Sequence, residues 1–213
     1  MSEDQKIIFD SIYTQVRSGF YSIEDIQNNI LDEIDDTGCA DEVSEEWAFE
    51  QIDNVFNDLQ QESKSWNENS FTSKLINAFD DLAKAKIIAI HYPGFTEEDG
   101  EYEAEEVERT LNDNDTKSVG YCFYNGYDLE NAISGNGLNI HFRKLNNNSD
   151  VVAKEVATKV IQILNNNGLE TTWDNKASSP IVIPNFKWEK IYNEDDRDLL
   201  NYNDVIDIIL ENK

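Results

Sequence analysis

The sequence predicts an α+β fold, in which a helical N-terminal region is followed by a mixed sheet of about five strands with covering helices. Two observations predict it: apolar residues recur every three or four positions through the first eighty residues, and from Lys86 short β-type runs alternate with helical stretches. The chain has 213 residues and is 39% hydrophobic, so it can bury a core despite its charge. We expect residues 1–84 to form the helical region and residues 85–213 the α+β domain, either as separate units or as one continuous domain.

Four stripes of apolar residues at helical spacing predict four helices in the N-terminal region. The first stripe ends at Gly19, because glycine favours helix C-termini. Ser22 and Asp25 resemble a capping box at the start of the second helix. The four stripes are Ile8, Phe9, Ile12, Tyr13 and Val16; Ile26, Ile30, Leu31 and Ile34; Trp47, Phe49, Ile52, Val55, Phe56 and Leu59; and Phe71, Leu75, Ala78, Phe79 and Leu82.

Five short runs rich in β-branched and aromatic residues predict the strands of the sheet. Pro184 indicates that the last strand is an edge strand or is interrupted, because proline cannot donate a hydrogen bond to a ladder. The short helix expected at 128–134 leaves the pairing of the second and third strands open between parallel and antiparallel. Ser149 and Gly168 bound the clearest helix, and 204–210 predicts a closing one. The predicted strands are 87–92, 119–124, 138–142, 169–173 and 181–188.

The cysteines and the N-terminus indicate the compartment. Cys39 and Cys122 are far apart in the chain, so we interpret both as reduced thiols, and without grouped cysteine or histidine ligands we expect no metal and no cofactor. The N-terminus carries acids where a secretion signal carries lysines. No stretch approaches the roughly 20 apolar residues of a membrane span. These features predict a cytoplasmic protein.

The chain is strongly acidic, with 44 Asp and Glu residues against 17 Lys and Arg residues and a formal net charge of −27. Such a charge repels DNA, RNA and anionic lipid surfaces, so neither nucleic acid nor membrane is expected as a partner. A basic protein is favoured instead. The acidity is concentrated in the first half, where residues 1–110 hold 28 acidic and 7 basic residues.

The densest acidic segment is a run of eight carboxylates in twelve positions. Like charges at this density weaken a helix unless a cation arrives, which favours a docking surface for a basic partner. The alternative is a solubilising, partly mobile loop, since charge runs are usually solvated. The candidate partner-binding residues are Glu97, Glu98, Asp99, Glu101, Glu103, Glu105, Glu106 and Glu108.

Short motifs follow one another in a recognisable order: KLINAFDDL at 74–82, IIA at 87–89, GYCFY at 120–124 and DLENAI at 128–133. Over about residues 70–190 they resemble a family of bacterial proteins of unknown function. The resemblance supports the fold and implies no activity. Further matching points are the run 135–142, the helix end at Gly168 and Leu169, Trp173 with Asp174, and Trp188.

The chain departs from the resembled family at two points. Relatives often carry paired cysteines after the first strand, where this chain has residues 91–100 without cysteine. They also often carry a histidine after the aromatic strand, where this chain has Asn125. A metal or redox role of those cysteines therefore does not carry over, and if the missing histidine is catalytic in relatives, this chain is inactive.

Few residues invite a catalytic interpretation, and no catalytic residue is assigned. His91 and His141 lie on predicted strands, and we interpret both as histidines on a solvated face, because a metal site would have to recruit carboxylates. No Gly-x-Ser-x-Gly elbow occurs. Asp174 with Lys176, downstream of Glu170, is similar to the acid-x-Lys element of metal-dependent nucleases, but its position after a strand favours a turn.

Together these observations favour a non-enzymatic binding protein for a basic protein partner, of the immunity-protein kind that blocks a toxin. One alternative is a metal-dependent hydrolase that uses carboxylates near Asp174, with Glu170 or Asp128. Another is a family member with no specific charged partner, whose acidity maintains solubility. The oligomeric state is left open.

Overall fold

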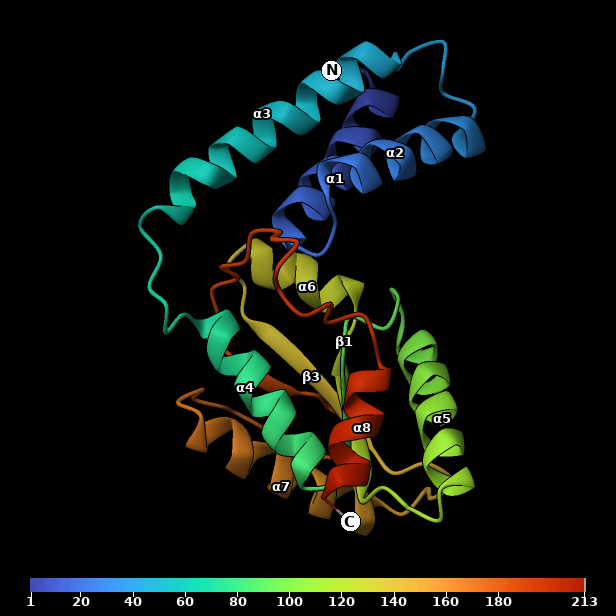
Figure 1. Ribbon diagram of the computed structural model, residues 1–213, viewed down its shortest axis with the longest axis vertical. Coiled ribbons are helices and arrows are strands. Elements are labelled where there is room, and N and C mark those ends of the chain that lie inside the picture. Colours follow the sequence, from blue (N-terminus) through green and yellow to red (C-terminus); the bar gives the residue numbers. More distant parts are fainter. Residues whose placement is uncertain (213) are drawn as a thin grey trace. The chain divides into compact units, whose positions relative to one another are not determined.

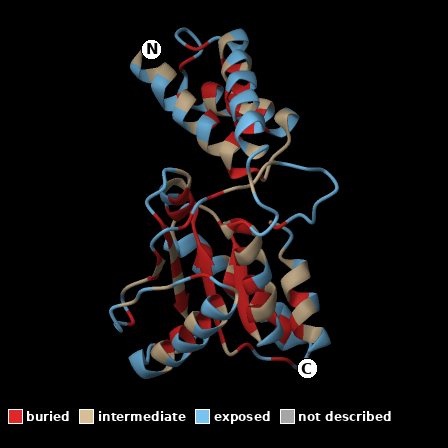
Figure 2. Cartoon of the chain, turned by 90° about the vertical axis from the view of Figure 1, so that its left-hand side faces the viewer, coloured by how far each residue is buried: buried red, intermediate tan, exposed pale blue. Residues whose placement is uncertain are grey.

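The computed structural model describes residues 1–212, which form two compact units. The helical unit comprises Met1–Asn67 and Glu189–Asp198, and the sheet unit comprises Glu68–Trp188 and Leu199–Lys213. In each unit the buried residues gather in the interior (Figure 2). Within the described residues no helix is long and apolar enough to cross a membrane.

Three helices form the helical unit: α1 (Glu3–Ser18), α2 (Ile23–Thr37) and α3 (Glu45–Ser63). Ser2 and Ser22 begin the first two with complete capping boxes, and Gly19 ends α1 in the left-handed conformation. The capping box at Ser22 and the terminator at Gly19 match the sequence pattern. The apolar stripes meet in a core of aliphatic side chains that includes Ile12, Ile30 and Ile52, all fully buried.

The fourth predicted helix, α4 (Phe71–Lys84), packs against the sheet of the sheet unit. That sheet has the order β1-β2-β3-β4. Its first two strands are parallel, while the other two pairings are antiparallel. The strands are β1 (Ile87–His91), β2 (Gly120–Tyr124), β3 (Leu138–Arg143) and β4 (Ile181–Ile183).

Helices cover both faces of the sheet (Figure 1). α4 and α7 (Asp150–Asn166) cover one face, where Phe79 of α4 contacts the rings of His91 and Tyr124. α5 (Glu97–Asp113) and α8 (Asn203–Glu211) cover the other face over β1 and β2, in a cluster with Ile88, Ile90, Tyr121 and Phe123. The short helix α6 (Gly126–Ile133) joins β2 to β3, and these two strands pair in antiparallel orientation.

The predicted α+β class is confirmed, with four strands in the described residues instead of about five. Residues 169–173 contribute a single bridge, from Thr172 to Val182. The antiparallel register of this bridge places Pro180 and Pro184 at the next hydrogen-bonding positions on either side, and neither proline has an amide hydrogen to donate. The strand predicted at 181–188 ends at Ile183, before Pro184, as the missing proline donor requires.

The acidic run is helical, and its local sequence explains why. Thr96 and Asp99 form a capping box, and the acids of the first turn face the positive end of the helix dipole. Gly100, Ala104, Val107 and Leu111 recur at helical spacing and are buried on the side of α5 that packs against the sheet. Burial of this stripe and the cap therefore outweigh the repulsion between neighbouring carboxylates.

Candidate functional site

A row of polar side chains lies on one face of β3. Leu138, Ile140 and Phe142 are buried, while Asn139, His141 and Arg143 alternate with them and are half-buried. Because successive strand residues point to opposite faces, the three polar side chains share the face that carries Tyr121 and Phe123 on β2. On this face α5 packs over β1 and β2, and α8 packs over β1.

Asp128 holds His141 from one side. It occupies the third position of α6, where its capping box with Asn125 fixes the carboxylate. The carboxylate accepts hydrogen bonds from the Asn125 amide, from Nδ2 of Asn139 and from Nε2 of His141, each at 3.0 Å. A carboxylate in this position only accepts, so Nε2 of His141 carries a proton.

Glu97 holds the same ring from the other side. It is the first residue of α5, and its Oε1 lies 2.5 Å from Nδ1 of His141. With a carboxylate at each ring nitrogen, the arrangement fits the doubly protonated imidazolium. Burial alone lowers the pKa of His141, but the hydrogen bond and charge of Asp128, together with Glu97, outweigh it and raise the pKa above 6.5.

The same geometry argues against a metal at this histidine. Asp128 and Glu97 contact different ring nitrogens, so one ion cannot bind both carboxylates and the ring together. Across residues 1–212 no group of three or more His, Cys, Asp or Glu side chains is placed to hold a metal ion.

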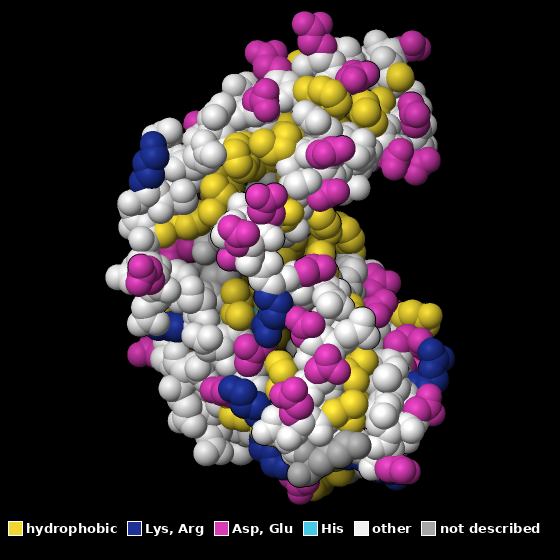
Figure 3. Space-filling model, viewed as in Figure 1, with side chains coloured by type: hydrophobic (Ala, Val, Ile, Leu, Met, Phe, Trp, Pro, Cys, Tyr) yellow, Lys and Arg dark blue, Asp and Glu magenta, His cyan; other side chains and the backbone are white. Residues whose placement is uncertain are grey.

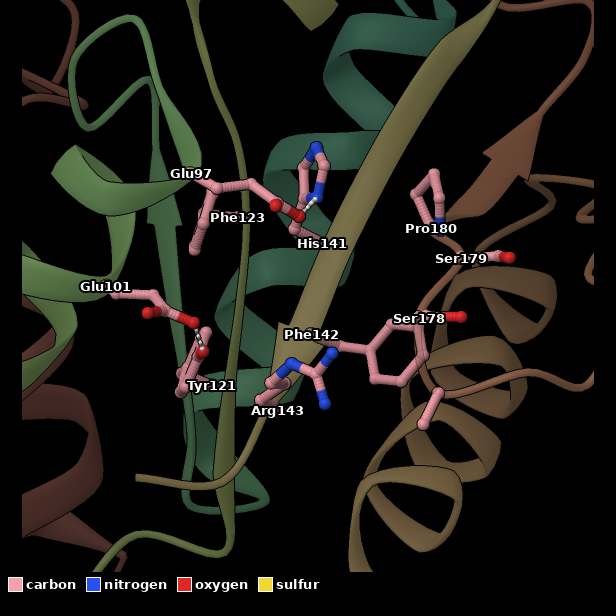
Figure 4. Close-up of a pocket in the computed structure, with 11 residues that line it drawn as sticks. Glu97, Glu101, Tyr121, Phe123, His141, Phe142, Arg143, Ser178, Ser179 and Pro180 are labelled. Carbon is pink, nitrogen blue, oxygen red and sulfur yellow. Dashed lines mark hydrogen bonds and ion pairs between the residues drawn. The ribbon is translucent and has the colours of Figure 1, made fainter. Parts of the chain in front are cut away.

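His141 borders a small pocket with a cavity volume of about 60 Å³ (Figure 4). On its α5 side Glu101 accepts a hydrogen bond of 2.7 Å from the hydroxyl of Tyr121. The His141 ring stacks on Phe123, which in turn packs on Gly100, where an added Cβ would come within 2.3 Å of the ring. The lining residues are Glu97, Glu101, Tyr121, Phe123, His141, Phe142, Arg143, Ala177, Ser178, Ser179 and Pro180.

The eight candidate acids fall into two groups. Five have partners: Glu97 contacts His141, Asp99 caps α5, Glu101 binds Tyr121, Glu106 pairs with Arg109, and Glu108 accepts from the amide of Ser118. The pKa of Asp99 is lowered by its hydrogen bonds from Thr96 and Phe95. No hydrogen bond or ion pair joins the other three to a described residue, and they are Glu98, Glu103 and Glu105.

Exposed aromatic rings lie beside the start of α5. Phe95 and Tyr127 have exposed fractions of 48% and 60%, and their ring centroids are 6.2 Å apart. The Phe95 ring packs on Gly126, whose amide donates to the carbonyl of Gly94 at 2.8 Å. Tyr102, on α5 itself, is 61% exposed. The Phe95 and Tyr127 rings therefore pack against neighbouring groups although both face solvent.

The expectation of solvated strand histidines is wrong for His91. Its side chain is buried between β1 and α4, stacked on Phe79, and Nδ1 lies 3.0 Å from the hydroxyl of Tyr124. The error has a simple cause, since helices cover both faces of β1. His141 is 16% exposed, so its face is only partly open.

Asp174 lies in an exposed turn, where it accepts from the amide of Lys176 at 3.0 Å and pairs with its ammonium group. Glu170 is exposed as well. Asp128, by contrast, belongs to the His141 site. The sequence did not bring Asp128, Glu97 and His141 together, although the alternation of polar residues on β3 was a usable signal.

The chain is thus an α+β protein with a histidine, His141, held between two carboxylates. A family model described as Domain of unknown function (DUF6891) matches residues 1–192, and the chain belongs to this family. Neither the comparison with curated proteins nor that with solved structures returned a match.

Proposed function

We propose that this protein binds a basic protein partner through the acidic and aromatic surface at the start of α5. We call this the α5 surface and define it by Phe95, Glu98, Tyr102, Glu105 and Tyr127. The observation that carries the proposal is the exposed Phe95 and Tyr127 ring pair beside carboxylates that have no partner in the described chain.

Aromatic rings and carboxylates together suit lysine and arginine side chains. A ring face attracts a cation, and a neighbouring carboxylate adds a charge-assisted hydrogen bond. Aromatic residues also anchor protein interfaces, because they bury a large area at little cost in side-chain entropy. Glu98, Tyr102 and Glu105 follow one another at helical spacing and are all exposed, so they share one face of α5.

Net charge supports the same class of partner. On the face shown in Figure 3, acidic side chains are widely spread, with fewer lysine and arginine side chains between them. A field of this sign speeds association with a cationic partner and repels anionic competitors. An immunity protein that neutralises a basic toxin is one instance of such a binder. The two buried free thiols fit a cytoplasmic setting.

Affinity capture with charge-matched variants tests this proposal. The native chain serves as bait in a lysate of its source cells, and each captured basic protein is purified and titrated against the bait by calorimetry. The variant F95A/E98Q/E105Q removes parts of the α5 surface. Its control, E45Q/E50Q with Ile7→Ala, removes the same charge and one exposed apolar side chain from α1 and α3.

The α5 variant is expected to weaken binding of the basic partner by at least about tenfold, as the loss of an interface anchor does. The control is expected to bind as the native chain does. Equal affinity of the native chain and the α5 variant, or capture of no basic protein at low salt, would contradict the proposal.

A further inference from the structure

The pocket beside His141 is lined by a positively charged side chain, Arg143, that has no ion pair with the described chain. Arg143 is a half-buried residue of β3 that lines the pocket, yet no hydrogen bond or ion pair joins its guanidinium to residues 1–212, and none is drawn to it in Figure 4. Arg17 and Arg109, by comparison, pair with Glu62 and Glu106. In a chain with 44 acidic residues, an unpaired arginine in a pocket is an unusual feature.

The two acids that line the pocket together with Arg143 are engaged by other groups. Glu97 contacts His141, and Glu101 accepts from the hydroxyl of Tyr121. Arg143 and His141 are two residues apart on β3, so their Cα atoms are about 7 Å apart on the same face. The pocket therefore offers two donor groups. The guanidinium of Arg143 has no hydrogen bond or ion pair to the described chain, and Nδ1 of His141 contacts the exposed side chain of Glu97.

An oxyanion fits these donors. The planar guanidinium matches the two oxygens of a carboxylate or phosphate, which it binds with paired hydrogen bonds. A cavity of about 60 Å³ is roughly twice the volume share of one water, so it admits the oxyanion group while the remainder of a ligand stays outside. Charges beyond about 8 Å are largely screened at physiological salt, so the groups that line the pocket, and not the net charge of the chain, determine what binds there.

We propose that Arg143 and His141 bind the oxyanion group, a carboxylate or phosphate, of a small molecule. Glu97 occupies the Nδ1 position of His141 when that ligand is absent. Its carboxylate is 64% exposed, so it can leave the ring without uncovering a buried charge, and the incoming oxyanion then accepts the same proton. This site and the α5 surface use different groups, with opposite preferences for ligand charge.

The ring resonances of His141 report on this site directly. Inorganic phosphate and acetate are titrated separately into the full chain, and the ring signals of His141 are followed by NMR, with buried His91 as the internal reference. Each ion is expected to shift the His141 signals in a saturable manner. The ion with the lower dissociation constant identifies the ligand group as a phosphate or a carboxylate.

Matched variants make the test specific. Arg143→Gln is expected to weaken binding at least about tenfold, since it removes hydrogen bonds to a charged group, while Arg143→Lys keeps the charge and weakens it less. Arg109→Gln removes the same charge outside the pocket and is expected to change affinity less than about twofold. Glu97→Gln is expected to strengthen binding, because the competing carboxylate is lost.

Unmoved His141 signals in both titrations would overturn the inference. So would an equal loss of affinity in Arg143→Gln and Arg109→Gln, because the effect would then be one of net charge alone.

Discussion

The helical unit and the sheet unit treat their carboxylates differently. In the helical unit no Asp or Glu is buried, and its core is a cluster of aliphatic side chains with helices capped by serine. In the sheet unit Asp128 is buried, bound by three donors, and paired with a histidine. Net charge alone therefore does not locate a site, because the acids with a chemical role are those that the fold buries and supplies with hydrogen-bond partners.

The largest expected change in stability concerns the aliphatic core of the helical unit. Ile52→Ala empties space at a fully buried position and should lower the free energy of unfolding by about 2–5 kcal/mol. Chemical denaturation followed by far-UV circular dichroism measures the loss. Glu50→Gln, on the same helix and exposed, is the control and should change stability by less than about 0.5 kcal/mol. Equal stability of both variants would mean that this core is not packed as described.

The buried carboxylate makes the matching prediction for the sheet unit. Asp128→Asn removes a charge that accepts three hydrogen bonds, so unfolding should become easier by about 1.5–3 kcal/mol. The pKa of His141 should fall as well, because its main charged partner is lost. Denaturation and an NMR titration of the histidine rings measure the two effects. Asp174→Asn, in an exposed turn, should leave both unchanged.

A close backbone approach sets the position of α5. Gly100→Ala would place a Cβ within 2.3 Å of the Phe123 ring, which is buried and stacked on His141. The ring or the helix must move, and overpacking of this kind costs about 1–3 kcal/mol. Gly38→Ala is unsuitable as a control, because alanine is strained at the φ of +69° that Gly38 adopts. Glu105→Ala, on the exposed face of α5, is the control. A G100A variant as stable as E105A would show that this contact is loose.

The smallest predicted effect is a dependence of stability on pH. Because the folded-state pKa of His141 is raised, its protonation stabilises the fold fully below the ordinary value of 6.5. That contribution is lost as the pH rises through the raised pKa, so the free energy of unfolding should decrease over this range. His141→Gln should abolish the decrease, which denaturation curves at a series of pH values will measure. An unchanged slope in H141Q would assign it to other groups.

Periodicity and turn chemistry predicted most of the fold. The stripes through Ile12, Ile30 and Ile52 and the terminator Gly19 lie where the pattern placed them, because each is a local consequence of helical spacing. The strand predicted at 169–173 is reduced to one bridge, because the next ladder positions on β4 are Pro180 and Pro184, which have no amide hydrogen. The pairing of β2 with β3 depends on tertiary packing, which α6 alone does not determine.

The candidate site was less predictable. The sequence singled out the eight acids as one surface, but tertiary contacts divide them, and Glu97 and Glu101 turn out to engage His141 and Tyr121. Asp128 and His141 are 13 positions apart, and only the turn from α6 into β3 brings them together. Burial of His91 likewise depends on packing against Phe79 of α4, which the residue pattern of the strand itself does not reveal.

The protonation of the His141 ring tests the central claim most directly, since the claim is that two carboxylates hold this ring as an imidazolium. Long-range ¹H–¹⁵N NMR of the full chain at pH 6.5 distinguishes protonated from bare ring nitrogens, and H141Q assigns the signals. The account predicts that both nitrogens of His141 are protonated in more than half of the molecules at that pH. A His141 ring that is mostly neutral at pH 6.5 would contradict it.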